Sequence, residues 1–477
     1  MGSFSSPSGS PPRSLQQGVV ARLERLPMTP YLWLLVLVAG GAWFVESLSI
    51  GATGVILPVL KPLWHLSSAE VGFLAVSSTV GVVVGLIPAG RIGDRIGRVR
   101  LLTYGIFVYS GLTLLSSLAP NYTVLVVLRL LAGLGMGAVF PLPYSIVSEF
   151  VSRTRRTWLS GVLDACLSVG YFIAPLLGLL ILPRVAPDLS WRLFMVAAGL
   201  PLLYALVVRR VMPESPRWLW HMGRQHEALV AVDRLEQRSR AYGPLPEPDV
   251  AAADAPEVPR HSARDTIRLY ARATVVSAVG ATGTFFMFYV VLTYMPTVFR
   301  QLGLPFATSL AFAAMVTAAA IPGKLLNGHL SERWGRKAVF ALFMGFAALS
   351  AILFATAPSI GWRLADGMGM SFFGTGAFPG LKMYYAEQYP TGYRVTGAST
   401  VEAVSRTLGG IVGAALMPIA WHSMGLGSSF LIIAAVALVS LAVVALWGRE
   451  TRGMTLERIE QQYLAPKAAR APAAANS

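Results

Sequence analysis

A carboxylate and a guanidinium stand inside two long apolar stretches of the chain. Glu46 lies in the stretch Tyr31–Val59, and Arg129 lies in the stretch Tyr122–Ser148. An ionisable side chain in hydrocarbon costs free energy and points by default to function. If both stretches are membrane-spanning helices, a rise of about 1.5 Å per residue puts the two side chains at similar depths, in the outer part of the bilayer.

Two opposite charges at one depth are what a proton switch needs. An ion pair would hold Glu46 ionised until Arg129 moves away, after which the carboxylate would take up a proton. The alternative is a static ion pair that braces two helices. Asp164, about 10 Å from the inner face of another apolar stretch, has no evident partner in the sequence. Either it faces a water-filled cavity as a solute contact or second proton site, or it receives a helix cap from a neighbour.

A second pair of charges lies in the stretch Val395–Ala420. Glu402 and Arg406 are four residues apart and therefore share one helical face. Arg406 falls near the midplane, where a guanidinium could clamp the carboxylate of a bound solute. The alternative is that Glu402 already satisfies Arg406 within its own helix.

Four further side chains bear on this chemistry. Tyr289 and Tyr294 lie in an aromatic-rich stretch and could line a cavity for a ring-shaped substrate. Lys324 and Lys382 lie near the inner ends of their stretches, and we expect them to snorkel to the membrane surface. No spacing of metal ligands or of a nucleophile with a base occurs, so we predict no metal, no cofactor and no enzyme.

The composition places these residues in a membrane protein. Apolar residues make up 55% of the chain and charged residues only 13%, far below the charged fraction of soluble proteins. The net charge of +16 does not indicate nucleic-acid binding. Lys and Arg gather instead in short loops on alternate sides of the apolar stretches, as the positive-inside rule requires. Both termini are therefore predicted to be cytoplasmic.

The apolar stretches predict an all-α membrane protein with twelve transmembrane helices in two pseudo-symmetric six-helix bundles. Residues 29–212 form the first bundle and residues 271–448 the second, joined by a cytoplasmic linker, 213–270, that contains a short amphipathic helix. Residues 1–28 are predicted to be a disordered cytoplasmic tail because they are rich in Ser, Pro and Gly. Residues 449–477 form the other cytoplasmic tail.

A charged motif occurs once in each half, between the second and third apolar stretches of that half. It reads GRIGDRIGRVR at 90–100 and GHLSERWGRK at 328–337, with G-x-x-x-(D/E)-R-x-G-R in common. We expect each copy to be a tight polar turn at the cytoplasmic face that locks one conformation and releases it in another. The residues expected to switch are Gly90, Asp94, Arg95, Gly97 and Arg98 in the first copy, and Gly328, Glu332, Arg333, Gly335 and Arg336 in the second.

These motifs resemble the signature loops of the major facilitator superfamily. PESPRWL at 213–219 and ETRG at 450–453 resemble the sugar porters and their metabolite–proton symporter relatives. Glu46, five residues before Gly51, resembles the helix-1 acid of the aromatic-acid and nicotinate-type symporters, although those families usually have Asp there. The resemblance implies two halves that rock about a central site, and in it Glu46 and Arg129 match the positions of the proton-coupling pair.

The expected function is proton-coupled symport of a small organic anion, most readily a carboxylate, by alternating access. A proton-driven efflux antiporter, a sugar porter and a non-transporting receptor on the same fold remain alternatives. The expected partners are the solute, protons and the lipid bilayer, with no nucleic acid. We expect a monomer in a bacterial inner membrane.

Overall fold

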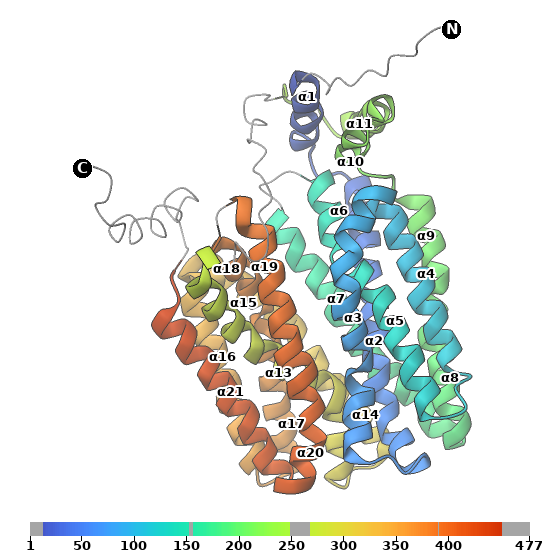
Figure 1. Ribbon diagram of the computed structural model, residues 1–477, viewed down its shortest axis with the longest axis vertical. Coiled ribbons are helices and arrows are strands. Elements are labelled where there is room, and N and C mark those ends of the chain that lie inside the picture. Colours follow the sequence, from blue (N-terminus) through green and yellow to red (C-terminus); the bar gives the residue numbers. More distant parts are fainter. Residues whose placement is uncertain (1–12, 152–155, 249–267, 390, 451–477) are drawn as a thin grey trace, which may run out of the picture.

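The computed structural model of the 477-residue chain describes residues 13–151, 156–248, 268–389 and 391–450. All regular structure within these ranges is helical. Eleven of the helices described there are long and apolar enough to cross a membrane. They stand side by side in two groups, one from each half of the chain (Figure 1). The prediction of an all-α membrane fold is confirmed.

The first half supplies six spans. The first three are single helices, and two of the later ones are each made of two consecutive helices with a short joint. In chain order they are α2 (Pro30–Leu63), α3 (Ser68–Ile96), α4 (Arg98–Ser116), α5 (Tyr122–Val139) with α6 (Leu142–Phe150), α7 (Arg156–Ile181), and α8 (Pro187–Gly199) with α9 (Tyr204–Val211).

The second half follows the same order and contains the twelfth predicted segment, which is broken into short helical pieces. Its helices are α13 (Ala271–Gln301), α14 (Phe306–Ala318) with α15 (Ala320–Trp334), α16 (Arg336–Thr356), α17 (Ile360–Gly369) with α18 (Phe378–Glu387), α19 (Thr391–Ser405) with α20 (Ala414–Met424), and α21 (Leu426–Trp447).

Two of these spans contain π-helical turns, Met370–Gly374 between α17 and α18 and Arg406–Gly413 between α19 and α20. Both turns press glycines against α13. A Cβ on Gly374 would lie 2.0 Å from the sulfur of Met287, and a Cβ on Gly409 would lie 2.3 Å from the carbonyl oxygen of Thr282. Such turns are often found at functional sites. The second one begins at Arg406.

The bundles touch most closely at the end opposite the linker, where backbone meets backbone. A Cβ on Gly54 of α2 would lie 2.6 Å from the carbonyl oxygen of Thr293 in α13, and a Cβ on Gly72 of α3 would lie 2.3 Å from that of Ala415 in α20. Glycines permit this close approach of helices. At these two points the backbones of the two halves are in contact.

At the other end lies a small helical cap (Figure 1). It consists of α1 (Arg13–Glu24), α10 (Pro216–His221) and α11 (Gln225–Arg240). The helix α1 contradicts the predicted disordered tail over these residues. Its Val19, Ala21 and Leu23 are buried, because the linker helices offer α1 an apolar surface that composition alone does not reveal.

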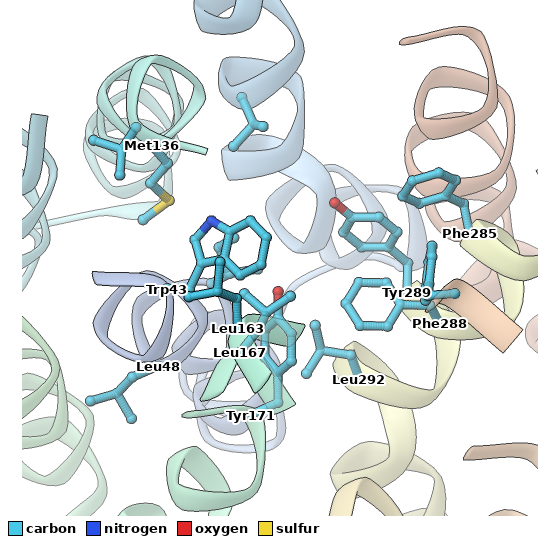
Figure 2. Close-up of a cluster of buried hydrophobic side chains, with 14 of the residues drawn as sticks. Trp43, Leu48, Met136, Leu163, Leu167, Tyr171, Phe285, Phe288, Tyr289 and Leu292 are labelled. Atoms are coloured by element: carbon cyan, nitrogen blue, oxygen red, sulfur yellow. The ribbon is translucent and has the colours of Figure 1, made fainter. Parts of the chain in front are cut away.

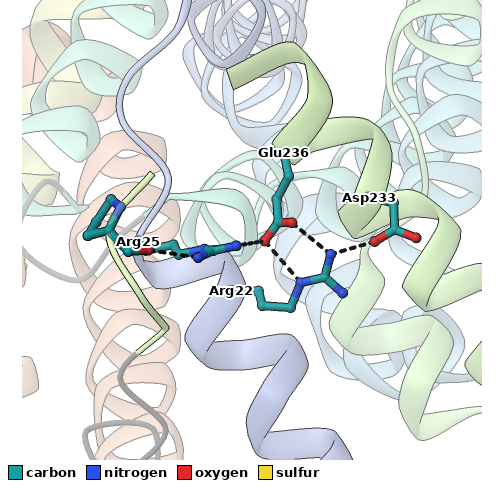
Figure 3. Close-up of polar contacts among 5 residues, drawn as sticks. Arg22, Arg25, Asp233 and Glu236 are labelled. Carbon is teal, nitrogen blue, oxygen red and sulfur yellow. Dashed lines mark hydrogen bonds and ion pairs between the residues drawn. The ribbon is translucent and has the colours of Figure 1, made fainter. Parts of the chain in front are cut away.

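Ion pairs hold α1 on α11 (Figure 3). Both carboxylate oxygens of Glu236 are engaged, at 2.8 Å from Arg22 Nη2 and 2.6 Å from Arg25 Nη2. Burial alone would raise the pKa of Glu236, but the hydrogen bonds from Arg22 and Arg25 outweigh it and hold that pKa below its ordinary value. Asp233 also pairs with Arg22, but its side chain is 54% exposed whereas that of Glu236 is 6% exposed.

We predict that Glu236→Gln releases α1, whereas the matched variant Asp233→Asn does so only slightly, because exposed ion pairs contribute less than about 1 kcal/mol. The measurement is the rate of tryptic cleavage after Arg22 and Arg25 in the purified protein. A group with a lowered pKa stabilises the fold above its unfolded pKa, about 4.3 for Glu. In the parent protein, protection of the α1 amides from hydrogen exchange, which unlike tryptic cleavage can be followed in acid, should therefore disappear only as the pH falls through the lowered value. Equal protection in both variants would contradict this account.

Candidate functional site

Aromatic side chains from both bundles meet in the middle of the molecule (Figure 2). Trp43 of α2 and Tyr171 of α7 face Phe288 and Tyr289 of α13. The rings of Tyr171 and Phe288 meet edge to face, with centroids 5.3 Å apart. All four side chains are buried. The contact between the two halves at mid-height is therefore built of rings.

Arg406 lies in this aromatic contact, and its side chain is only 4% exposed. Its guanidinium carbon is 4.3 Å from the ring centre of Phe140, which follows α5 in the first bundle, and 5.1 Å from that of Phe285 in α13. Rings on both sides can stabilise a cation through their faces. The faces of these rings are also surfaces on which the flat ring of a ligand can pack.

The hydrogen bonds of Arg406 leave part of its binding capacity unused. One terminal nitrogen donates to Glu402 Oε1 at 2.8 Å and the other to the Tyr289 hydroxyl at 3.1 Å, while Nε has no partner. The alternative in which Glu402 satisfies Arg406 is therefore realised in part. Glu402 is itself 23% exposed, so it can give way to a competing anion. Tyr294 is not part of this cluster, since its hydroxyl donates to the carbonyl of Ala414 at 2.9 Å.

Glu46 is completely buried in α2, and neither of its carboxylate oxygens has a hydrogen-bond partner. Arg129 does not pair with it in this conformation. Its guanidinium donates instead to the carbonyl of Ser49 at 2.7 Å and to the hydroxyl of Thr113 at 3.2 Å. The positive charge that acts on Glu46 is that of Arg406, from the other bundle. A Glu46–Arg129 ion pair in another state of the molecule stays a prediction.

Asp164 has partners that lie far away in the sequence. Its carboxylate accepts from Lys382 of α18 at 3.0 and 3.3 Å, and its backbone carbonyl accepts from Lys324 of α15 at 3.4 Å. The snorkelling expected for the two lysines is wrong, because Lys324 is only 3% exposed and Lys382 is held by Asp164. Asp164 in the opposite bundle offers both ammonium groups a closer partner than the membrane surface does, its carboxylate to Lys382 and its backbone carbonyl to Lys324.

The repeated motifs are not tight turns, which corrects that expectation. Helix α3 continues through the charged residues to Ile96, and α4 begins at Arg98, so Gly97 alone forms the joint, with φ +105° and ψ 148°. Gly335 joins α15 to α16 in the same way, with φ +97° and ψ 152°. A 29-residue helix is longer than the hydrocarbon core is thick. Its charged end can therefore stay helical outside the hydrocarbon.

An acidic residue fits against each of these joints. Glu214 accepts from the backbone N–H groups of Arg98 and Val99 at 2.9 and 3.0 Å. Glu450 accepts from those of Arg336 and Lys337, both at 3.1 Å. Each carboxylate caps the first turn of a helix and offsets the positive end of its dipole.

The arginine after each glycine makes a second, equivalent contact. Arg98 pairs with Glu149 at the end of α6, and Arg336 with Glu387 at the end of α18, at 3.0 Å. Of the other expected switch residues, Arg95, Glu332 and Arg333 are exposed, and a Cβ on Gly328 would meet nothing within 4 Å. The surroundings of Gly90 and of the Asp94 side chain lie outside what the structure describes.

Several residues of the site were not anticipated. Glu214 and Glu450 stand in the PESPRWL and ETRG motifs, so the signal was present, but it carried no indication of what the acids contact. Trp43 and Phe140 are linked by a hydrogen bond from the indole nitrogen to the Phe140 carbonyl, at 2.9 Å. Aromatic residues are so common in membrane helices that these two carried no distinguishing signal.

Comparisons with known proteins are consistent with this arrangement. A model described as Major Facilitator Superfamily matches residues 32–414 and 315–474. The niacin transporter NiaP of Acinetobacter baylyi is 29% identical over 445 residues, covering 92% of this chain and 99% of that protein. The 4-hydroxybenzoate transporter PcaK of Pseudomonas putida is 26% identical over 445 residues, covering 89% and 95%.

Among solved structures, the xylose transporter XylE from E. coli, in a partially occluded inward open conformation, has a TM-score of 0.71. It shares 17% sequence identity, and the match covers 90% of this chain and 100% of that one. At this identity the likeness concerns the fold.

The glycine joints generate a prediction with an internal control. Gly425, between α20 and α21, has a similar backbone, with φ +82° and ψ 161°, but a Cβ there would meet nothing within 4 Å. At Gly97 and Gly335 a Cβ would lie 2.5 and 2.6 Å from the carboxylates of Glu214 and Glu450. Gly425→Ala should therefore cost only backbone strain, about 1–3 kcal/mol.

We predict that Gly97→Ala and Gly335→Ala each cost about 1 kcal/mol more than Gly425→Ala, because they also displace a helix cap. Thermal unfolding of the purified variants in detergent measures the difference. Glu214→Gln and Glu450→Gln should weaken the same caps without backbone strain. Equal losses at all three glycines would show that the two carboxylates contribute nothing.

Proposed function

The chain belongs to the major facilitator superfamily, and on that premise we propose that it is a proton-coupled symporter of small carboxylates that carry an aromatic or heteroaromatic ring. The family makes it a multi-pass membrane transporter. The proposal further places it as a monomer in a bacterial inner membrane, with both termini and the linker in the cytoplasm. Both bundles, residues 29–212 and 271–448, would rock about the contact at Arg406.

The observation that carries the substrate class is the setting of Arg406. A guanidinium between two rings, with one nitrogen unpaired, offers a charge for a carboxylate and flat surfaces for a ring. Relatives named as niacin and 4-hydroxybenzoate transporters support the same class.

The charge balance of the described membrane-embedded centre also favours an anion. Basic side chains outnumber acidic ones by one there, and a net charge buried without compensation is costly. A bound carboxylate would reduce this excess of positive charge. The basic side chains are Arg129, Lys324, Lys382 and Arg406, and the acidic ones are Glu46, Asp164 and Glu402.

A sugar substrate is the weaker alternative. Sugar hydroxyls are usually recognised by several donors and acceptors placed together. Hydroxyl side chains in the small cavity between the bundles could supply such groups, but a neutral sugar would leave the excess positive charge around Arg406 uncompensated. The lining of that cavity is Ser168, Tyr171, Phe288, Val291, Leu292, Thr317, Ala320, Ser371 and Thr375.

We assign the proton to Glu46. A buried carboxylate without a hydrogen-bond donor is most stable in its neutral form. Once Glu46 is neutral, its negative charge no longer competes for Arg406, which is then available to a substrate carboxylate. Arg129 would hold α2 in place through the Ser49 carbonyl, one turn from Glu46. Asp164 is the less suitable proton carrier, because its carboxylate already accepts hydrogen bonds from Lys382.

The substrate class is tested by uptake into proteoliposomes under an imposed pH gradient. We expect accumulation of nicotinate and 4-hydroxybenzoate, and none of nicotinamide or xylose. Arg406→Gln should weaken carboxylate binding by about 10- to 100-fold, the effect of losing a charged hydrogen bond of about 1.5–3 kcal/mol. Arg300→Gln, an exposed arginine near the end of α13, is the control. Accumulation of xylose instead would favour the sugar porter, and loss of preloaded carboxylate against its gradient would favour efflux.

The proton assignment predicts a separation of two activities. Glu46→Gln imitates the protonated acid permanently, so it should still exchange labelled for unlabelled substrate but should not accumulate substrate in response to a pH gradient. Asp366→Asn is the control, because it removes an acid of α17 in the part of the span that is remote from the linker. It should retain both activities. Should Glu46→Gln accumulate substrate as well as the parent does, the proton site lies elsewhere, with Asp164 the next candidate.

A further inference from the structure

One carboxylate faces two ammonium groups across the contact between the bundles. Asp164 belongs to α7 in the first half, whereas Lys324 and Lys382 belong to α15 and α18 in the second. These residues lie about 8–15 Å from the linker-side ends of their helices. The Asp164–Lys382 bridge is an ion pair that links one bundle to the other.

The cluster of Asp164, Lys324 and Lys382 has more positive charge than an ion pair between the bundles requires. Asp164 is 4% exposed, and its carboxylate is occupied by Lys382. Lys324 is equally buried, yet the contacts of its ammonium group are a 3.4 Å hydrogen bond to a backbone carbonyl and the Phe378 ring, with its centre 5.9 Å away. A buried ammonium with so little compensation is costly, and the excess charge suits an anion.

Aromatic rings connect the lysines to the Arg406 site. The Lys382 ammonium lies 5.4 Å from the ring centre of Trp43, whose indole donates to the carbonyl of Phe140. The ring of that same Phe140 covers Arg406. On the other side, Phe378 meets Phe285 with centroids 5.0 Å apart. A flat ring could thus remain in contact with rings while its carboxylate passes from Arg406 to the lysines.

We propose that Lys324 and Lys382 form a second carboxylate-binding station between Arg406 and the linker side of the protein, and that a carboxylate bound there displaces Asp164 from Lys382. The proposal rests on the proposed function, since it concerns the same substrate. A carboxylate on the lysines replaces the ion pair that Lys382 makes with the other bundle, so this link between the halves is released while an anion is present. In the empty carrier Asp164 returns to Lys382 and neutralises it, which allows the halves to close again.

The test is calorimetric titration of the purified full-length protein with nicotinate. Asp164→Asn removes the competing carboxylate and keeps both lysines, so nicotinate should bind about 10-fold more tightly, a change of about 1.4 kcal/mol. Lys324→Met and Lys382→Met should each weaken binding about 10-fold. Lys61→Met, near the opposite end of α2, should leave the affinity unchanged. If the Asp164–Lys382 ion pair only holds the bundles together, Asp164→Asn should lower the stability of the protein and should not increase its affinity for nicotinate.

Two further measurements keep the result interpretable. Lys324→Arg and Lys382→Arg retain the charge and should retain binding, and thermal unfolding identifies any variant that fails to fold. Titrations in chloride and in methanesulfonate, neither of which is a carboxylate, distinguish the substrate carboxylate from an inorganic anion. Lys324→Met and Lys382→Met could abolish the effect of chloride on the titration and leave the affinity for nicotinate unchanged. The lysines would then bind chloride rather than carboxylates, and the proposal would be overturned.

The outcomes separate this proposal from the proposed function. If neither nicotinate nor 4-hydroxybenzoate binds the parent protein, the proposed substrate class is overturned. Binding that depends on Arg406 but is unchanged in folded Lys324→Met and Lys382→Met would leave that class intact and overturn the second station alone.

Discussion

The bilayer interior offers no partner to a charged group, and the arrangement of this protein depends on that constraint. Several charged side chains within the described spans are buried in the protein, among them Glu46, Arg129, Asp164, Lys324 and Arg406. Some find partners within their own half, as Arg406 does with Glu402. Asp164 and Lys382 find theirs only in the opposite half. The contact between the bundles is thus partly polar, and it can open only when something else satisfies these groups.

The duplication of the chain is visible at the linker-side ends of the helices and lost at the centre. Each half has a glycine joint, a carboxylate that caps the following helix, and an arginine that pairs with a glutamate. The centre is not duplicated, because Glu46 stands in the first half whereas Arg406 and both lysines stand in the second. The shared ends make the two halves equivalent there, while the unequal centre places Glu46, the proposed proton-binding acid, in one half and Arg406 with both lysines in the other.

The sequence could predict those features of the structure that a local pattern of residues determines. Apolar stretches and loop charges specify the order and depth of the helices, and four-residue spacing specifies the Glu402–Arg406 pair. Depth is only one coordinate, however. A helix that is apolar on all sides gives no indication of its rotation, so Glu46 and Arg129 were placed at one level without evidence that they touch. Asp164 and Lys382 are 218 residues apart, and no local pattern relates them. The π-helical turns are local, but glycine clusters alone do not distinguish them from close helix packing.

Coupling between proton and anion can arise here from shared charge rather than from a long chain of movements. Glu46 and a substrate carboxylate would both act on Arg406, so neutralising one favours the other. Linkage then requires reciprocity: if a proton on Glu46 increases the affinity for the anion by some factor, the bound anion increases the affinity for the proton by the same factor. The buried surroundings strengthen this coupling, since a charge separated from water acts over a longer range. A carrier built in this way needs no contact between the proton and the substrate, only one cation that both of them influence.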